Sequence, residues 1–553
     1  MVKRLRFAPK QFCIVTFVAL VLLFGSFYIG GVRQNTSRQI LLPNHPNELS
    51  EFRTLASTID SYELIFNDTL LVTEWIYVEN GGELVILNST VVFVNEGLSI
   101  VAEAGGNLTI SGSFLYSSPD CDWWISGNSQ ANLKIEYCRM IGSGTGTGDA
   151  IQVRCDRAIV RECQIENFGG NGLHAFECDY VIFENNTISN CDWEGIDFVN
   201  TVGLIVSGNR ISETGYCGIF GIDSIDANIE SNTILSTNSL GIGLANVEDS
   251  EVSSNYIQES GLDSISLEYC NQIAVQNNTI TQSYGCGILS IRSTHLYLRY
   301  NSIWNASWDG INLLDFSENI EITGNLLSEI ISCGIASSST KGLLIAGNWI
   351  EDIGIDGLNI HENSENVTIL LNTILDCRGI GMYFLGSNEI LVAGNWVNNS
   401  RLCDVANRWS ENGLVFLNAF CSEDIEPGAS LGGFFSWDNG TMGNYWADHG
   451  GEDADGDLIG DSLYVVDDGD YDFYPLVDLT LFEEFRINHN EWFDISTNVD
   501  PTGNETDTTT TSFVSDIFWI DGQMMDVFLT VNATIQIIGV IVILIILRTK
   551  YIQ

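Results

Sequence analysis

An asparagine followed two residues later by an apolar residue recurs about every 23 residues through the middle of this chain. Successive copies are 23 or 24 residues apart, and they stand at Asn186, Asn209, Asn232, Asn255, Asn278, Asn301, Asn325, Asn348, Asn372, Asn395 and Asn418. A repeating unit this short cannot bury its apolar face alone, so neighbouring copies must stack on one another. The spacing therefore predicts a solenoid.

The residue types within each repeat indicate strands. Segments such as residues 273–280, IAVQNNTI, alternate apolar and polar side chains with a period of two. Asn and Gly stand at the corners, where the backbone needs left-handed or otherwise strained angles. We therefore expect an all-β, right-handed parallel β-helix over residues 81–425. Its earlier corners hold Ser89, Ser113, Cys138 and Cys163 in place of Asn.

The charge balance excludes one class of partner. Asp and Glu number 72 against 22 Lys and Arg, which gives a formal net charge of −50. Nucleic-acid binding requires a basic face for phosphate contacts, so we expect no nucleic-acid partner. An acidic exterior is compatible with divalent cations, or it serves only to keep a sheet-rich rod soluble.

Both ends of the chain carry apolar runs flanked by basic residues. Residues 11–31 follow four basic residues and are long enough to span a bilayer, as an uncleaved anchor or as a removed signal peptide. Residues 530–547 are uncharged and are followed by Arg548 and Lys550. The positive-inside rule then places both tips in the cytoplasm and the rest outside the cell membrane. A terminal strand or packing helix is the alternative for residues 530–547.

These features predict eight segments along the chain. They are a cytoplasmic tip (1–10), a transmembrane signal anchor (11–31), an N-terminal cap (32–80), the β-helix (81–425), an acidic C-terminal cap (426–480), a stalk (481–529), a transmembrane helix (530–547) and a cytoplasmic tail (548–553). Asn-x-Ser/Thr sequons, such as those at Asn67, Asn88 and Asn439, are compatible with an exported glycoprotein.

A carboxylate-rich loop follows the last repeat. Asp453, Asp455, Asp457 and Asp461 take positions 1, 3, 5 and 9 of this loop, a pattern that converges oxygens on a hard cation such as Ca²⁺. Leu458 stands where such loops place a glycine. The sequence predicts a calcium site here, with an acidic, solvated turn as the alternative.

The repeats and the block that follows them resemble a known family. Gly443-Asn444-Tyr445-Trp446, the aspartates of the loop, and Tyr474-Pro475-Leu476 are similar to the terminal block of archaeal β-helix surface proteins related to the NosD-type copper-binding family. The resemblance covers residues 81–477 and implies the fold and an exported location. It does not extend to copper, because the chain has only six His and six Met, with no cluster of them outside the membrane segments.

One group of carboxylates is a candidate for catalysis. Most repeats carry a Gly-Ile or Gly-Leu pair nine or ten residues after the corner asparagine, such as Gly195-Ile196, where a strand is expected to start. The second residue after this glycine is expected to face outward, and this column contains Asp197. Glu194 and Asp223 lie within one coil of it, and paired carboxylates perform general acid/base chemistry on glycosidic bonds. Solvated surface acids are the alternative. A second column, Asp263, Asp309 and Asp356, stands just before strand starts and is expected to cap the backbone of the turns.

Aromatic residues suggest a sugar-binding function without catalysis. Tyr256, Trp349 and Trp396 each follow a corner asparagine in one column, where flat rings could stack on the sugar faces of an extended polysaccharide. Rings that merely cover the corners of the sheet are the alternative.

The sequence thus favours a membrane-anchored, extracellular rod with a binding, scaffold or adhesion role toward carbohydrate or other surface proteins. The alternative is a polysaccharide lyase or glycoside hydrolase that uses carboxylates on one outer face. A groove with converging carboxylates and a basic residue would favour the enzyme, and a flat, uniformly acidic wall would favour the scaffold.

Overall fold

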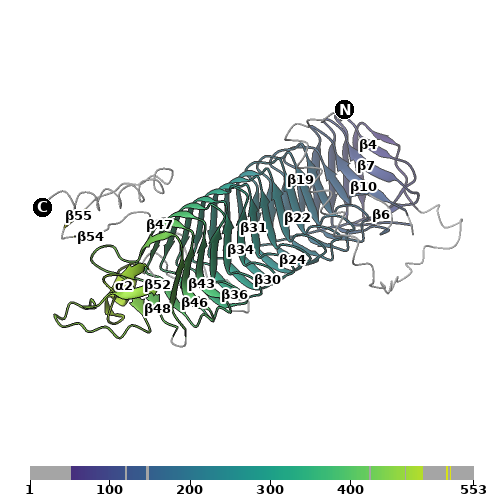
Figure 1. Ribbon diagram of the computed structural model, residues 1–553. Helices are drawn as coiled ribbons and strands as arrows, with labels where there is room; N and C mark the ends of the chain where they lie inside the picture. The colour runs from purple at the N-terminus through teal and green to yellow at the C-terminus, as the bar shows by residue number, and fades with distance from the viewer. Residues whose placement is uncertain are drawn as a thin grey trace, which may run out of the picture. The chain divides into compact units, whose positions relative to one another are not determined.

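The computed structural model describes residues 52–118, 121–144, 148–422, 425–467, 469–489, 519–520 and 523–524. Each coil of the described solenoid contributes one strand to each of three parallel sheets of 17 strands, which we call sheets I, II and III (Figure 1). The prediction of a right-handed parallel β-helix is confirmed.

Every sheet takes each third strand of the chain, as solenoid winding requires. Sheet I contains β1 (Thr58–Ile59), β4 (Ile76–Val78), β7 (Leu98–Ala102), β10 (Trp123–Gly127), β13 (Ile151–Val153), β16 (Leu173–Phe176), β19 (Ile196–Val199), β22 (Ile219–Ile222), β25 (Ile242–Ala245), β28 (Ile265–Glu268), β31 (Ile288–Ile291), β34 (Ile311–Leu314), β37 (Ile335–Ser338), β40 (Leu358–His361), β43 (Ile380–Leu385), β46 (Cys403–Arg408) and β49 (Gly428–Leu431). Sheet II contains β2 (Tyr62–Phe66), β5 (Glu83–Leu87), β8 (Asn107–Ser111), β11 (Asn132–Glu136), β14 (Ile159–Arg161), β17 (Ile182–Glu184), β20 (Ile205–Ser207), β23 (Asn228–Glu230), β26 (Glu248–Ser253), β29 (Asn271–Gln276), β32 (Thr294–Arg299), β35 (Glu318–Thr323), β38 (Lys341–Ala346), β41 (Glu365–Leu370), β44 (Asn388–Ala393), β47 (Glu411–Phe416) and β50 (Phe434–Ser436). Sheet III contains β3 (Thr69–Val72), β6 (Thr90–Phe93), β9 (Phe114–Ser117), β12 (Arg139–Ile141), β15 (Gln164–Glu166), β18 (Thr187–Ser189), β21 (Arg210–Ser212), β24 (Thr233–Thr237), β27 (Tyr256–Ser260), β30 (Thr279–Ser283), β33 (Ser302–Ala306), β36 (Leu326–Ile330), β39 (Trp349–Ile353), β42 (Thr373–Leu375), β45 (Trp396–Asn398), β48 (Ala419–Phe420) and β51 (Tyr445–Trp446).

The solenoid is longer than the predicted range of 81–425 at both ends. Strands β1 to β4 already form coils within the segment expected to be an N-terminal cap, and β49 to β51 extend into the expected acidic cap. The early coils lack the asparagine marker, and serine hydroxyl or cysteine thiol groups stand in its place. The backbone N–H of Ser89 donates to Oγ of Ser113 at 3.1 Å.

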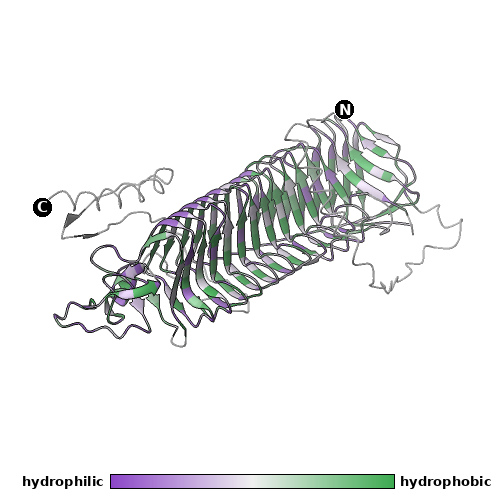
Figure 2. Ribbon diagram, in the orientation of Figure 1, coloured by the Kyte–Doolittle hydropathy of each residue, from purple (hydrophilic) through white to green (hydrophobic). Residues whose placement is uncertain are grey.

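Apolar side chains alternate inward and fill one continuous core. Ile265 and Leu267 on β28 are fully buried, whereas Ser266 between them faces outward. Apolar residues recur along the strands of every coil (Figure 2). The alternation follows from the strand period of two, so each wall of the rod displays the second set of side chains to solvent.

The predicted asparagine corner is confirmed as a ladder of buried amides. Oδ1 of Asn255 accepts hydrogen bonds from the backbone N–H of Asn232 at 2.9 Å and from its Nδ2 at 3.0 Å. Asn278 binds Asn255 in the same way, one coil further on. The ladder continues to Asn444, whose backbone N–H donates to Oδ2 of the buried Asp472 at 2.7 Å.

Two further elements follow the last coil. The antiparallel hairpin of β52 (Tyr464–Asp467) and β53 (Asp470–Asp472) is succeeded by helix α2 (Thr480–His489). The backbone N–H of Thr480 donates to Oδ1 of Asp478 at 2.8 Å, as is usual at helix starts. A short antiparallel pair, β54 (Trp519–Ile520) and β55 (Gln523–Met524), completes the described strands.

The predicted membrane segments, 11–31 and 530–547, lie outside the described residues, as do the cytoplasmic ends and most of the stalk. Within the described ranges, no helix is both long and apolar enough to cross a bilayer.

Candidate active site

The outward-facing column of sheet I carries the first of the predicted carboxylates. Strand pairing places His174 on β16, Asp197 on β19 and Phe220 on β22 side by side in register. The column therefore exists as the strand-start spacing predicted. Glu194 lies in the turn that leads into β19, so its side chain comes from the edge of the same wall.

Asp223 belongs to a different part of the wall. It follows the last residue of β22, and the pairing of Val199 with Ile222 places it beside Asn200, not beside Asp197. Nδ2 of Asn246, one coil later, donates to its Oδ1. The structure therefore brings Glu194 and Asp197 to one end of the strands and leaves Asp223 at the other.

His174 links Asp197 to a second carboxylate that the sequence did not single out. Its Nδ1 lies 3.0 Å from Oδ2 of Asp149, and its Nε2 lies 3.4 Å from Oδ2 of Asp197. Asp149 is buried in the turn before β13, and its Oδ1 accepts the backbone N–H of Asn171 at 2.8 Å. The imidazole is thus fixed between two carboxylates from two different coils.

Burial and mutual charge perturb the titration of this group. Burial raises the pKa of Glu194 to about 7, and the charge of Asp197 adds to the rise. Burial also raises the pKa of Asp197 to about 6, although the positive charge of His174 opposes it. For His174 burial lowers the pKa, but the hydrogen bond to Asp149 and the charge of Asp197 outweigh burial and leave the pKa above its ordinary value.

This pKa pattern suits proton transfer. Two carboxyl groups that titrate near neutral pH can hold and release protons under physiological conditions, which ordinary surface carboxylates cannot do. The site can therefore supply a general acid and a general base from adjacent positions on one wall.

The same column of sheet I leads into a groove of about 400 Å³ that lies next to this cluster. Tyr77 on β4, Ser126 on β10 and Gln152 on β13 line it, and register pairing connects Gln152 directly to His174. Trp75 and Trp124 stand at its side with their ring centroids 5.2 Å apart. The groove thus combines aromatic faces with polar groups, as saccharide sites require.

One basic residue stands at the junction of the groove and the cluster. Arg154 follows β13, lines the groove, and holds its guanidinium 4.9 Å from the ring centroid of Phe176 on β16. Its positive charge acts on His174 as well. Arg154 lines the groove, whereas Asp149, Glu194 and Asp197 lie beside it and not among its lining residues.

The turn aspartates further along the rod provide a comparison. Oδ1 of Asp309 accepts the backbone N–H of Cys333 at 2.9 Å, and its Oδ2 accepts Nδ2 of Asn312 at 2.6 Å. Asp356 makes equivalent bonds to Ile380 and Asn359. These contacts fit the structural role predicted for that column, but they join Asp309 and Asp356 to the backbone of the next coil and not to their own backbone. At Asp149, Nε2 of Gln152 donates to Oδ2 at 3.3 Å as the equivalent amide, and the titratable His174 approaches the same oxygen as an additional partner.

The predicted sugar-stacking column lies on sheet III. Tyr256, Trp349 and Trp396 begin strands β27, β39 and β45, and the first two are partly exposed. Trp396 packs against Phe482 of α2, with ring centroids 6.0 Å apart. Arg486 of the same helix donates to Oγ1 of Thr373, the residue between Trp349 and Trp396 in register. Helix α2 therefore occupies part of this column.

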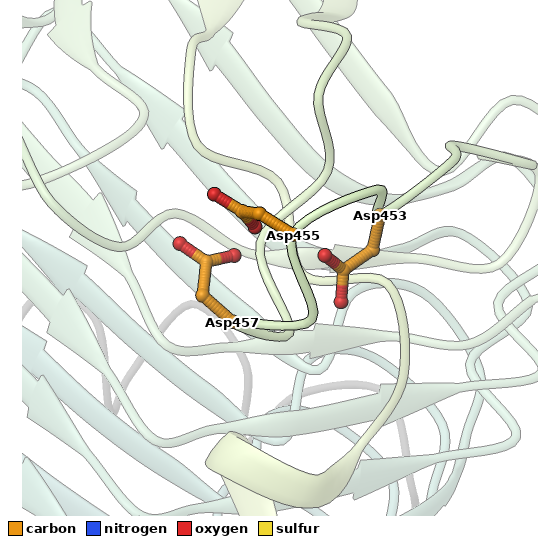
Figure 3. Close-up of side chains that lie close together, drawn as sticks. All are labelled: Asp453, Asp455 and Asp457. Carbon is orange, nitrogen blue, oxygen red and sulfur yellow. The ribbon is translucent and has the colours of Figure 1, made fainter.

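The acidic loop gathers three of its four predicted ligands. Carboxylate oxygens of Asp453, Asp455 and Asp457 all lie within 4.8 Å of one another (Figure 3). The remaining aspartate, Asp461, accepts the backbone N–H of Ala454 at 2.7 Å. Leu458 adopts a left-handed φ of 70°, the conformation for which a glycine is usual at this place.

The pKa values of two aspartates in this loop shift in opposite directions. The charge of Asp457 raises the pKa of Asp455. For Asp453, desolvation acts to raise the pKa, but backbone N–H groups of Gly456 and Leu458 outweigh it and lower the pKa. Three close oxygens suit the preference of Ca²⁺ for carboxylate ligands, so the calcium site remains a prediction.

Comparison with known proteins agrees with the fold. A family model described as the right handed beta helix region matches residues 123–265, 194–350 and 263–420, which together span more than half of the chain. This match does not show the resemblance to NosD-type proteins or an archaeal source, which both stay predictions. No curated protein matches the chain significantly.

Three solved structures with similar coils are described as two epimerases and a glucanase. The periplasmic alginate epimerase AlgG is 16% identical, with a TM-score of 0.42 over 54% of this chain and 76% of that one. The A-module of a mannuronan C-5 epimerase from Azotobacter vinelandii is 12% identical, with a TM-score of 0.32 over 64% and 88%. A GH87 α-1,3-glucanase from Streptomyces thermodiastaticus is 14% identical, with a TM-score of 0.33 over 56% and 59%. These similarities do not assign a function to this chain.

Proposed function

Because this chain belongs to the right-handed β-helix family, we propose that it binds an extended polysaccharide along sheet I and cleaves its glycosidic bonds there by hydrolysis. The observation that carries the proposal is the bridge of His174 between Asp149 and Asp197, with Glu194 beside it, at the end of an aromatic groove. Structural turns elsewhere on the rod do not need a titratable bridge, as the Asp309 and Asp356 turns illustrate.

The polymer would cross the strands and follow the axis of the rod. Outward residues of successive coils, from Tyr77 through Ser126 and Gln152 to His174, form one continuous track in register. Rings of Trp75 and Trp124 would stack on sugar faces, while Arg154 would donate hydrogen bonds to hydroxyl or carboxylate groups of the sugars.

Two carboxyl groups carry the reaction in this proposal. Glu194, which is protonated up to about pH 7, donates its proton to the glycosidic oxygen as the bond from that oxygen to the anomeric carbon breaks. Asp197, ionised above about pH 6, takes a proton from the water that attacks the anomeric carbon. His174 is a positioning residue whose positive charge favours the carboxylate form of Asp197, and Asp149 orients its ring.

The cellular location of the protein is also part of the proposed function. We place the rod outside a membrane, tethered by residues 11–31 and 530–547, because these apolar runs carry basic residues on their outer sides. The sequence alone favoured binding or adhesion without catalysis. In that case the groove would still bind the polysaccharide, and Glu194 and Asp197 would transfer no protons.

Release of reducing ends from a panel of purified neutral and acidic polysaccharides tests the proposal. The wild-type chain should cleave at least one of them, and Glu194→Gln should lower the rate about 100-fold or more, the usual contribution of a general acid. Asp223→Asn is the matched control, because Asp223 lies at the other end of the strands and should be dispensable. An unsaturated, ultraviolet-absorbing product would identify a lyase and overturn hydrolysis.

A further inference from the structure

A second and larger groove lies on a different wall of the rod. It has a volume of about 920 Å³ and is formed by sheet II strands β23, β26, β29 and β32 together with the turns that lead into them. None of the sheet I residues of the proposed active site lines it. The groove is therefore a separate concavity on the described solenoid.

A stacked bend in the backbone runs along this groove. Asp226, Asp249, Gln272 and His295 occupy equivalent places in four successive coils, and all have a left-handed φ between 50° and 58°. Pairing between β26 and β29 joins Glu248 to Asn271 and Ser250 to Ile273, on either side of the bend. All four of these residues line the groove, together with small residues such as Ala274.

The lining is acidic, with two amide side chains, one imidazole and one phenol ring. Asp226, Asp249 and Glu251 supply carboxylates, and Gln272 donates to Asp249 from the next coil. Tyr297 presents its ring on the same wall. The cation beside this ring is Arg299, which Glu321 already holds through two hydrogen bonds of 2.8 and 2.7 Å.

One acceptor beneath the groove is left without a partner. Oδ1 of Asn228 is buried and makes no hydrogen bond to any described residue. A buried carbonyl oxygen without a donor is unfavourable, and a ligand hydroxyl that reached it would satisfy it.

We propose that this groove binds a neutral saccharide. Carboxylates and amides accept and donate hydrogen bonds to sugar hydroxyls, and the Tyr297 ring offers a stacking face. Among the described residues that line the groove, three are carboxylates and none is Lys or Arg, so the groove repels anionic sugars. A metal ion fits this groove less well. Among the described residues, the acidic groups that lie close enough to share an ion are those of Asp453, Asp455 and Asp457, which lie outside the groove. The groove would hold the rod on a glycan independently of cleavage on sheet I.

Calorimetric binding of neutral gluco- and manno-oligosaccharides to the full chain tests this site. The measurements use a Trp75→Ala/Trp124→Ala background, so that the sheet I groove does not contribute. Ala274→Arg should fill the sheet II groove and weaken the remaining binding at least tenfold. Ser266→Arg is the matched control, because it adds the same charge to an outward position of the same coil on sheet I.

Tyr297→Ala should also weaken binding, and Tyr297→Phe should largely preserve it if the ring stacks on sugar. Loss of all binding in the Trp75→Ala/Trp124→Ala background would overturn this site while leaving the proposed active site intact. Equal binding by Ala274→Arg and Ser266→Arg, or a response to Ca²⁺ alone, would overturn it as well. Loss of cleavage in Glu194→Gln concerns only the proposed function.

Discussion

Nδ1 of His174 lies 3.0 Å from Oδ2 of Asp149, although 25 residues separate the two in the chain. One coil of the β-helix covers this separation, so the two side chains meet across neighbouring turns. The contact holds the imidazole beside Asp197, in the group of side chains for which we propose proton transfer.

The pH dependence of cleavage follows from the two raised pKa values. Activity requires Asp197 ionised and Glu194 protonated, so kcat/KM should rise as pH increases through about 6 and fall as pH increases through about 7. Initial rates between pH 4 and 9 measure this bell shape, and its two limbs report the pair as a whole. A flat profile across this range would rule out the acid and base roles.

Aromatic residues of the sheet I groove should contribute substrate affinity. Trp75→Ala should raise KM about tenfold, which corresponds to roughly 1.4 kcal/mol, because the ring loses its contact with a sugar face. Trp349→Ala on sheet III is the control with the same chemical change. If Trp349→Ala raises KM and Trp75→Ala does not, the polysaccharide binds to the sheet III column.

Stability of the coils should depend on each rung of the asparagine ladder. Asn255→Ala removes the acceptor of the Asn232 backbone N–H and the donor to the Ile229 carbonyl, so it should cost roughly 2–4 kcal/mol. Hydrogen exchange of the Asn232 amide measures this locally, which suits a solenoid whose repeats open in part. In the Tyr256→Ala variant, which changes the exposed neighbour of Asn255, the Asn232 amide should exchange as slowly as in the wild type. Equal loss of protection of this amide in both variants would contradict the role of the ladder.

Calcium should stabilise the acidic loop and the cap around it. Cation binding screens the close carboxylates of Asp453, Asp455 and Asp457, so millimolar Ca²⁺ should raise the Tm of the chelated protein. Asp455→Ala combined with Asp457→Ala should abolish that rise. An unchanged Tm in the wild type would leave an ordinary acidic turn.

How far the sequence predicts this molecule depends on how strictly each feature repeats. Asn232, Asn255 and Asn278 keep a spacing of 23 residues, so their stacking could be predicted, and the same register placed Asp197 in an outward column. Asp149 was missed because the coils before Cys163 are irregular in length and lack the Gly-Ile start. Its role depends on a contact across coils, which the column alone does not show.

Other contacts were beyond the reach of the repeat pattern. Trp75 lies in a segment predicted to be a cap, because the first coils carry no asparagine marker. Trp396 is covered by Phe482, 86 residues later, and a period of 23 residues says nothing about a helix that folds back onto the coils. Pairing between distant elements of this kind arises from tertiary packing.

Comparison of binding with turnover in Asp197→Asn separates catalysis from adhesion on sheet I. The amide keeps the size of the side chain but cannot accept a proton from water, so oligosaccharide affinity should stay within about threefold while turnover falls about 100-fold or more. Calorimetry and reducing-end release on the same preparation give both values. A wild-type chain that binds the oligosaccharide and never cleaves it, or an Asp197→Asn variant that cleaves at the wild-type rate, would contradict the proposed hydrolysis.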